Sequence, residues 1–131
     1  MSFSHEKLNV YQRSLEFIEF VNKNINFGKS RVNVIDQLDR ASTSITLNIA
    51  EGTGKFTGRD KCRYYDIARG SAVESAACLD ILARKKMITE NCKEEGKAIL
   101  QEIVSMLFGL IKSSSDRAYE NEVDYNSSKD N

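Results

Sequence analysis

The chain has no proline and only seven glycines among its 131 residues. Proline interrupts helices, and β-rich folds need frequent turns in which proline and glycine are common. A chain with so few of these residues is therefore suited to long, continuous helices. We predict an all-α fold in a single domain, because 131 residues are enough to bury a core without disulfides or metal ions.

The clearest helical pattern lies between residues 34 and 52. At about 100° per residue, its apolar and small side chains gather on one face of a helix. That face consists of Val34, Ile35, Leu38, Ser42, Ile45, Ile49 and Gly52. The flank, where a solvated helix normally carries lysine and glutamate, holds the small or polar residues Ala41, Ser44 and Asn48. We therefore expect this helix to contact more than one neighbour.

Three more segments repeat apolar residues at helical spacing. The first begins near His5 or Glu6, and its expected core stripe is Leu8, Tyr11, Leu15, Ile18 and Ile25. Another follows a glycine-rich loop and a candidate cap at Thr57, with the stripe Tyr64, Ile67, Ser71, Glu74, Cys78, Ile81 and Leu82. The last is expected to end near residues 113–115, with the stripe Cys92, Ile99, Ile103, Met106, Leu107, Leu110 and Ile111. Four helices joined by short connections favour an up-down-up-down bundle.

We assign residues 1–118 to the four-helix bundle domain and residues 119–131 to a disordered acidic tail. The tail is polar, carries more acidic than basic residues and shows no apolar period, which is typical of disorder. Elsewhere, no stretch approaches the roughly 18 apolar residues of a membrane span, and the N-terminus lacks the pattern of a signal peptide. We therefore expect a cytoplasmic protein that has no membrane partner.

The three cysteines give no sign of a metal site. Cys62, Cys78 and Cys92 are far apart, and neither a C-x-x-C motif nor a nearby pair of histidines accompanies them. Cys78 and Cys92 fall at apolar helix positions, where buried, reduced thiols are the ordinary interpretation. We predict neither a bound metal nor a cofactor.

Glu74 is a carboxylate on a predicted apolar stripe. A buried carboxylate without a partner is costly, so it must be paired, hydrogen-bonded or protonated. We predict a buried polar layer of Ser44, Asn48 and Glu74 that fixes the register of the helices. A ligand-binding or subunit-contact role is the alternative. Catalysis is not expected, because the only histidine is His5 and no Ser–His, Cys–His or Glu-x-x-His arrangement is evident.

Several residues lie on helix faces turned away from the predicted core. Charged anchors among small or apolar side chains suit a subunit interface. We therefore predict an oligomer interface formed by Arg40, Leu47, Glu51, Tyr65, Arg69, Ala72 and Ala76.

The charges of the whole chain balance, with 19 basic and 19 acidic residues, so any attraction to nucleic acid must be local. Residues 55–69 contain five basic and only two acidic residues, with aromatic residues among them. Basic side chains contact phosphates and aromatic rings stack on bases. The predicted nucleic-acid-binding residues are Lys55, Arg59, Lys61 and Arg63. The glycine-rich loop beside them lacks the spacing of a phosphate-binding loop.

Two blocks of the sequence carry a family resemblance. Residues 40–52, with Arg40-Ala41, Ser44-Ile45 and Asn48-Ile49-Ala50-Glu51-Gly52, precede residues 64–72, which read Tyr-Tyr-Asp-Ile-Ala-Arg-Gly-Ser-Ala, and Glu74. Together with residues 8–12 near the N-terminus, these blocks resemble the 23S rRNA intervening-sequence protein family over about residues 6–112.

The resemblance implies a left-handed four-helix bundle that assembles into a ring-like homopentamer. It also implies distant similarity to the accessory proteins of diversity-generating retroelements, pentamers that engage a reverse transcriptase and RNA. We therefore expect a non-enzymatic, homo-oligomeric accessory protein whose partners are copies of itself and RNA or a nucleic-acid-processing protein. The alternative is a protein-binding assembly scaffold without a nucleic-acid role.

Overall fold

The structure, a computed structural model, describes residues 1–27 and 33–129, and describes only the backbone of residues 116–129. A short 3-10 helix, η1 (Ser4–Lys7), precedes four α-helices. These are α1 (Asn9–Asn24), α2 (Asn33–Thr53), α3 (Gly58–Arg84) and α4 (Glu90–Lys129). The described residues contain no strand, which confirms the predicted all-α class.

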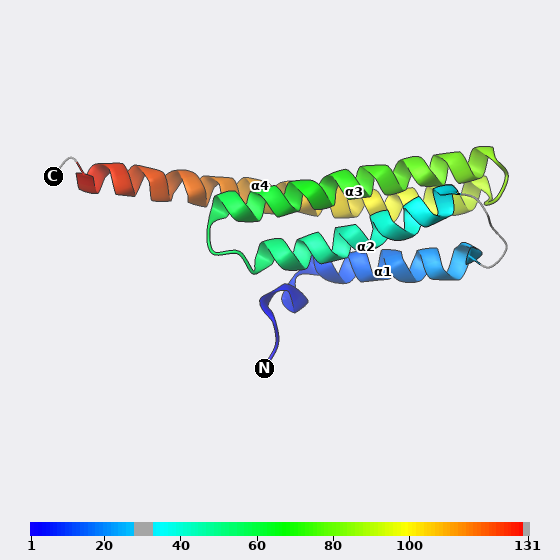
Figure 1. The fold of residues 1–131 in the computed structure, drawn as a ribbon, viewed down its shortest axis with the longest axis horizontal. Helices are drawn as coiled ribbons and strands as arrows, with labels where there is room; N and C mark the ends of the chain where they lie inside the picture. The colour runs from blue at the N-terminus through cyan, green and yellow to red at the C-terminus, as the bar shows by residue number, and fades with distance from the viewer. Residues whose placement is uncertain (28–32, 130–131) are drawn as a thin grey trace.

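The four helices surround one core. Helix α3 packs between α2 and α4, and α1 contacts both α2 and α4. Figure 1 shows successive helices running in opposite directions, with the α2–α3 connection and the α3–α4 turn at opposite ends of the bundle. The N-terminal segment also lies toward the end that carries the α2–α3 connection. This is the expected up-down-up-down arrangement.

The predicted core face of α2 is confirmed: all seven of its residues are buried. Leu38, Ile45 and Ile49 are fully inaccessible at the centre of the core. They pack with large buried side chains from the other three helices, among them Phe17, Leu79, Leu82, Ile103 and Leu107.

The predicted core stripe of α1 is confirmed only in part: Ile25 is buried, and Leu8 and Tyr11 pack against the core. The buried face carries Val10, Ser14, Phe17 and Val21, whereas Leu8, Tyr11, Leu15 and Ile18 are only half-buried. Apolar residues surround much of this helix, so the spacing alone does not decide which face turns inward. The helix also begins later than predicted, because Leu8 has an extended backbone between η1 and α1.

The predicted orientation of α3 is also wrong. Its inward face carries Tyr65, Ala68, Ala72, Ser75, Leu79 and Leu82. Of the predicted stripe, Ser71, Cys78 and Leu82 are buried, but Ile67, Glu74 and Ile81 are exposed. The alanines explain the rotation, since small side chains let α3 lie close to the helices on both sides. A helical wheel gives more weight to the larger isoleucines.

The helix ends match the prediction at α3 but not at α4. The Thr57 hydroxyl accepts a hydrogen bond of 3.1 Å from the Asp60 amide, which confirms the predicted cap of α3. Helix α4 does not end at residues 113–115 but continues to Lys129, beyond the rest of the bundle (Figure 1). No proline or glycine follows Gly109, so nothing in the backbone stops an established helix.

The helical backbone thus crosses the predicted domain boundary at residue 118 and runs through most of the tail that we expected to be disordered. Residues 130 and 131 lie outside the described residues. In the part of the chain that the structure describes, no helix combines the length and the apolar character needed to cross a membrane.

Candidate functional site

Ser44 and Asn48 form a polar contact between helices, but their partner is not Glu74. The Ser44 and Ser71 hydroxyl oxygens lie 2.9 Å apart across the α2–α3 contact. Asn48 Nδ2 donates to Ser44 Oγ at 3.0 Å and to the Ser44 carbonyl at 2.8 Å. Glu74 is exposed, so the prediction of a buried carboxylate is wrong. The rotation of α3 turns it outward.

A second polar contact lies deeper in the bundle, and the sequence did not predict it. The Thr46 hydroxyl donates to Ser14 Oγ at 2.9 Å, and the Ser14 hydroxyl donates to the Tyr11 carbonyl at 2.6 Å. This contact joins α1 to α2. Both Ser14 and Thr46 are buried, and a small hydroxyl residue in a helix carries no sequence signal that names its partner.

Glu74 and Arg40 instead line a hollow on the surface between α2 and α3. The hollow has a volume of about 380 Å³, and the contacting Ser44 and Ser71 also line it. No three His, Cys, Asp or Glu side chains among the described residues are grouped to hold a metal ion.

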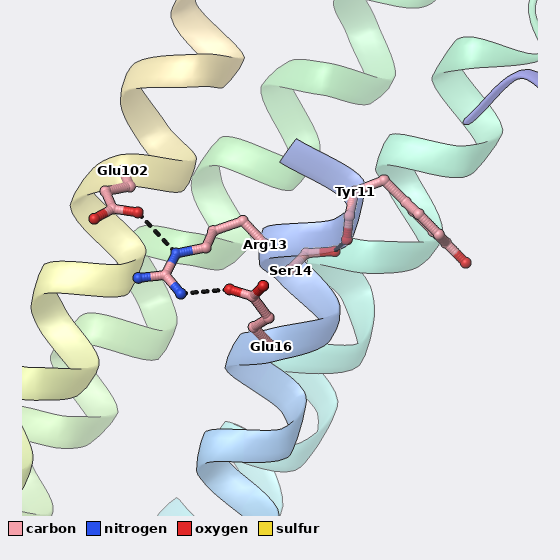
Figure 2. Close-up of polar contacts among 5 residues, drawn as sticks. All are labelled: Tyr11, Arg13, Ser14, Glu16 and Glu102. Carbon is pink, nitrogen blue, oxygen red and sulfur yellow. Dashed lines mark hydrogen bonds and ion pairs between the residues drawn. The ribbon is translucent and has the colours of Figure 1, made fainter. Parts of the chain in front are cut away.

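An ion-pair cluster joins α1 to α4 (Figure 2). Arg13 Nε donates to Glu102 at 2.7 Å, and the same guanidinium pairs with Glu16. These carboxylates raise the pKa of Arg13 further, so its charge is permanent. Both carboxylates are more than half exposed, and such surface pairs contribute about 0–1 kcal/mol to stability. The cluster is an exterior link between helices.

Burial makes the three cysteine thiols weaker acids than exposed thiols. It raises the pKa of Cys62, Cys78 and Cys92 above the ordinary value, so all three are neutral thiols at pH 7. Since the thiolate is the reactive form, none is activated as a nucleophile.

The predicted oligomer-interface residues do not share one surface. Tyr65 points into the core at 2% exposure, so its assignment to an outer face is wrong. Ala72 is also buried, at 0% exposure, but lines a groove between α3 and α4. Arg40, Leu47 and Glu51 are exposed on α2. The remaining two predicted residues, Arg69 and Ala76, are half-buried on α3.

An apolar groove runs between α3 and α4. Its volume is about 450 Å³, and it is lined by Ala72, Val73, Ala76, Lys97, Leu100, Gln101, Val104, Ser105 and Phe108. Val73 and Phe108 remain 54% and 56% exposed. The Arg69 guanidinium lies 5.6 Å from the centre of the Phe108 ring and pairs with Asp66 at 2.9 Å. The groove thus leaves part of two large apolar side chains in contact with solvent.

The four predicted nucleic-acid-binding residues all lie at the α2–α3 end of the bundle, but their side chains differ. Lys61 Nζ donates to the Thr53 carbonyl at 2.8 Å and so holds the connection together. Lys55 Nζ lies 3.6 Å from the Glu51 carboxylate. Lys55 and Lys61 are half-buried, whereas Arg59 and Arg63 are exposed. The two arginines are therefore the more exposed cations of the four.

The aromatic residues of this end also differ. Tyr65 points into the core, where its hydroxyl lies 2.9 Å from Thr53 Oγ1, and burial raises its pKa. The Tyr64 ring has Lys55 Nζ at 4.9 Å and the Arg63 guanidinium at 5.2 Å from its centre. Phe56 is fully exposed.

These features define a four-helix protein with two distinctive exterior features. One is the basic end, the α2–α3 end that carries Lys55, Arg59, Lys61 and Arg63, and the other is the apolar groove between α3 and α4. The chain belongs to the family of 23S rRNA-intervening sequence proteins, to which residues 6–109 match.

A crystal structure of a protein of unknown function from the S23 ribosomal protein family of Bacteroides thetaiotaomicron VPI-5482 is similar, with a TM-score of 0.71 and 32% sequence identity. The similarity covers 79% of this chain and 98% of that chain. No curated protein matches the sequence.

Proposed function

We propose that this protein is a non-enzymatic, homo-oligomeric accessory protein of the cytoplasm that binds RNA or another nucleic acid through the α2–α3 end of its bundle. The observation that carries the proposal is that Lys55, Arg59, Lys61 and Arg63 lie at the same end of the bundle as the fully exposed Phe56. Cations beside an accessible aromatic ring suit a ligand that has both phosphates and bases.

The charge distribution supports a local contact. Acidic and basic residues are equal in number over the whole chain, so the molecule as a whole does not attract a polyanion. Two exposed arginines on one helix turn give a modest phosphate-binding site. In an oligomer whose copies face the same nucleic acid, repetition of that site would raise the overall affinity.

Neutralising the exposed arginines tests the nucleic-acid contact. We expect the double variant Arg59→Gln/Arg63→Gln to bind labelled single-stranded RNA more weakly and with a weaker salt dependence. The slope of log K against log salt should fall by about 0.7 for each phosphate that the variant no longer neutralises. Fluorescence anisotropy over a series of KCl concentrations measures both quantities.

The matched control is Arg84→Gln/Lys85→Gln, which removes two exposed cations at the C-terminal end of α3. Figure 1 shows this end of α3 opposite to the α2–α3 connection. The control should leave affinity and slope unchanged. An equal weakening in the control, or RNA binding without salt dependence, would contradict a site at the α2–α3 end.

For the oligomer, we propose a ring-like homopentamer in which the apolar groove between α3 and α4 is covered by a neighbouring subunit. Val73 offers the sharpest test because it lines the groove and is 54% exposed. We expect Val73→Glu to lower the mass measured by light scattering after size exclusion from five chains toward the 14.8 kDa of one chain.

Ala98→Glu is the control for this variant, since Ala98 is exposed on α4 outside the groove. An unchanged mass for Val73→Glu, or a single-chain mass for the unaltered protein, would refute assembly through the groove.

The same groove favours a second candidate function, a protein-binding scaffold without a nucleic-acid role. That function predicts no measurable RNA affinity at low salt and tight binding of another protein that Val73→Glu abolishes.

A further inference from the structure

Phe56 is a fully exposed apolar side chain on a connection that several hydrogen bonds hold in place. Its backbone neighbours are fixed by hydrogen bonds from the Gly54 amide to the Ala50 carbonyl at 3.2 Å and from the Lys55 amide to the Gly52 carbonyl at 3.1 Å. The Thr57 cap and the bond from Lys61 to Thr53 hold the same connection from the α3 side. Because hydrogen bonds already hold the backbone there, a partner that stacks on the exposed ring would have to order only the Phe56 side chain.

Phe56 differs in this respect from the other aromatic residues of the basic end. Tyr65 is buried, and the Tyr64 ring already has two cations, Lys55 and Arg63, within 5.2 Å of its centre. A base can reach the ring of Phe56 without displacing either cation. Sequence spacing alone does not separate these three rings.

We propose that Phe56 stacks on an unpaired base of a single-stranded nucleic acid while Arg59 and Arg63 contact its phosphates, so that the site selects single strands over duplexes. The inference rests on the proposed nucleic-acid function and names its substrate class. In a duplex the bases are stacked on one another and their faces are closed to a side chain. An unpaired base offers a free face, and stacking on an aromatic ring tolerates any base.

The test compares the full chain and three variants, Phe56→Ala, Phe56→Leu and Phe56→Trp, in anisotropy titrations. The probes are a labelled, unstructured single-stranded RNA and the blunt duplex of the same sequence. Phe56→Ala should weaken single-strand binding roughly tenfold, with the duplex affinity and the salt slope unchanged. Phe56→Trp should retain or strengthen single-strand binding, and Phe56→Leu should match alanine because leucine is apolar but cannot stack.

Each other outcome overturns the inference in a distinguishable way. Equal affinity for single strand and duplex, or unchanged binding in Phe56→Ala, would rule out the stacking contact without contradicting the arginine site. Full retention of binding in Phe56→Leu would show that Phe56 contributes an apolar contact and does not stack on a base. A changed oligomer mass in Phe56→Ala with unchanged RNA affinity places the ring in a protein interface. Binding of neither probe by the unaltered chain refutes the proposed function itself.

Discussion

Replacing Phe17 with alanine will lower the free energy of unfolding by about 3–5 kcal/mol. Phe17 is fully buried at the centre of α1, and its ring stacks on Phe20 with the centroids 6.0 Å apart. The truncation removes apolar area from the core and leaves a cavity that the surrounding helices can close only in part. Urea unfolding followed by far-ultraviolet circular dichroism measures the change.

Phe56→Ala is the matched control, because it deletes the same side chain from a fully exposed position. Its free energy of unfolding should stay within about 0.5 kcal/mol of the unaltered protein. All variants must be compared at one protein concentration, since self-association shifts apparent stability. Similar decreases for the two variants would show that α1 does not turn Phe17 into the core.

The second large effect is expected at Gly52. A β-carbon at this position would lie 2.9 Å from the Tyr64 β-carbon and 3.0 Å from the Tyr65 ring. The Tyr64 β-carbon is bonded to the backbone of α3, so the two helices would have to move apart. We expect Gly52→Ala to reduce the free energy of unfolding by about 1–3 kcal/mol through overpacking, again measured by urea unfolding.

Gly70→Ala should instead raise the free energy of unfolding. Nothing lies within 4 Å of a β-carbon placed on Gly70, and the residue is within α3. Alanine favours the helix there by about 0.5–1 kcal/mol. A stabilising Gly52→Ala substitution would contradict the close approach of α2 and α3.

The buried face of a helix was predictable from the sequence only where apolar residues are narrowly confined. Helix α2 has one apolar stripe, so its buried face was predicted correctly. In α1, Phe17 and Val21 compete with Leu15 and Ile18 on a broad apolar surface, and only contact with the other helices selects the first pair. Such a choice depends on tertiary packing, which a helical wheel does not contain.

The buried face of α3 was predicted wrongly for a related reason. Ala68 and Ala72 are small, so they carry little weight on a wheel, yet both are fully buried where α3 lies close to its neighbours. The consequence reached the predicted sites, because the same rotation exposes Glu74 and buries Tyr65. The family and the helical class were predicted correctly, since they rest on motifs and composition and not on orientation.

For the basic end, the sequence located the cluster of cations, but it did not indicate which of their side chains are exposed or which groups they contact. Local charge excess identified residues 55–69, whereas the bond from Lys61 to the Thr53 carbonyl depends on the shape of the connection. The apolar groove was missed at Val73, Val104 and Phe108, because it forms only when α3 and α4 lie side by side. The local charge of a segment was predictable, whereas the side-chain contacts between segments were not.

The two hydroxyl contacts, Ser14–Thr46 and Ser44–Ser71, bear on how uniquely the bundle is assembled. Apolar side chains pack acceptably in several sliding positions, and moving one helix by a turn shifts it by only about 5.4 Å. Such a slide would part these hydroxyls, whereas in this arrangement every described buried side-chain polar atom has a partner. In a displaced packing, these buried hydroxyl groups would lose their hydrogen-bond partners, which costs free energy. The contacts therefore favour this one alignment of the helices over others more than they add to its stability.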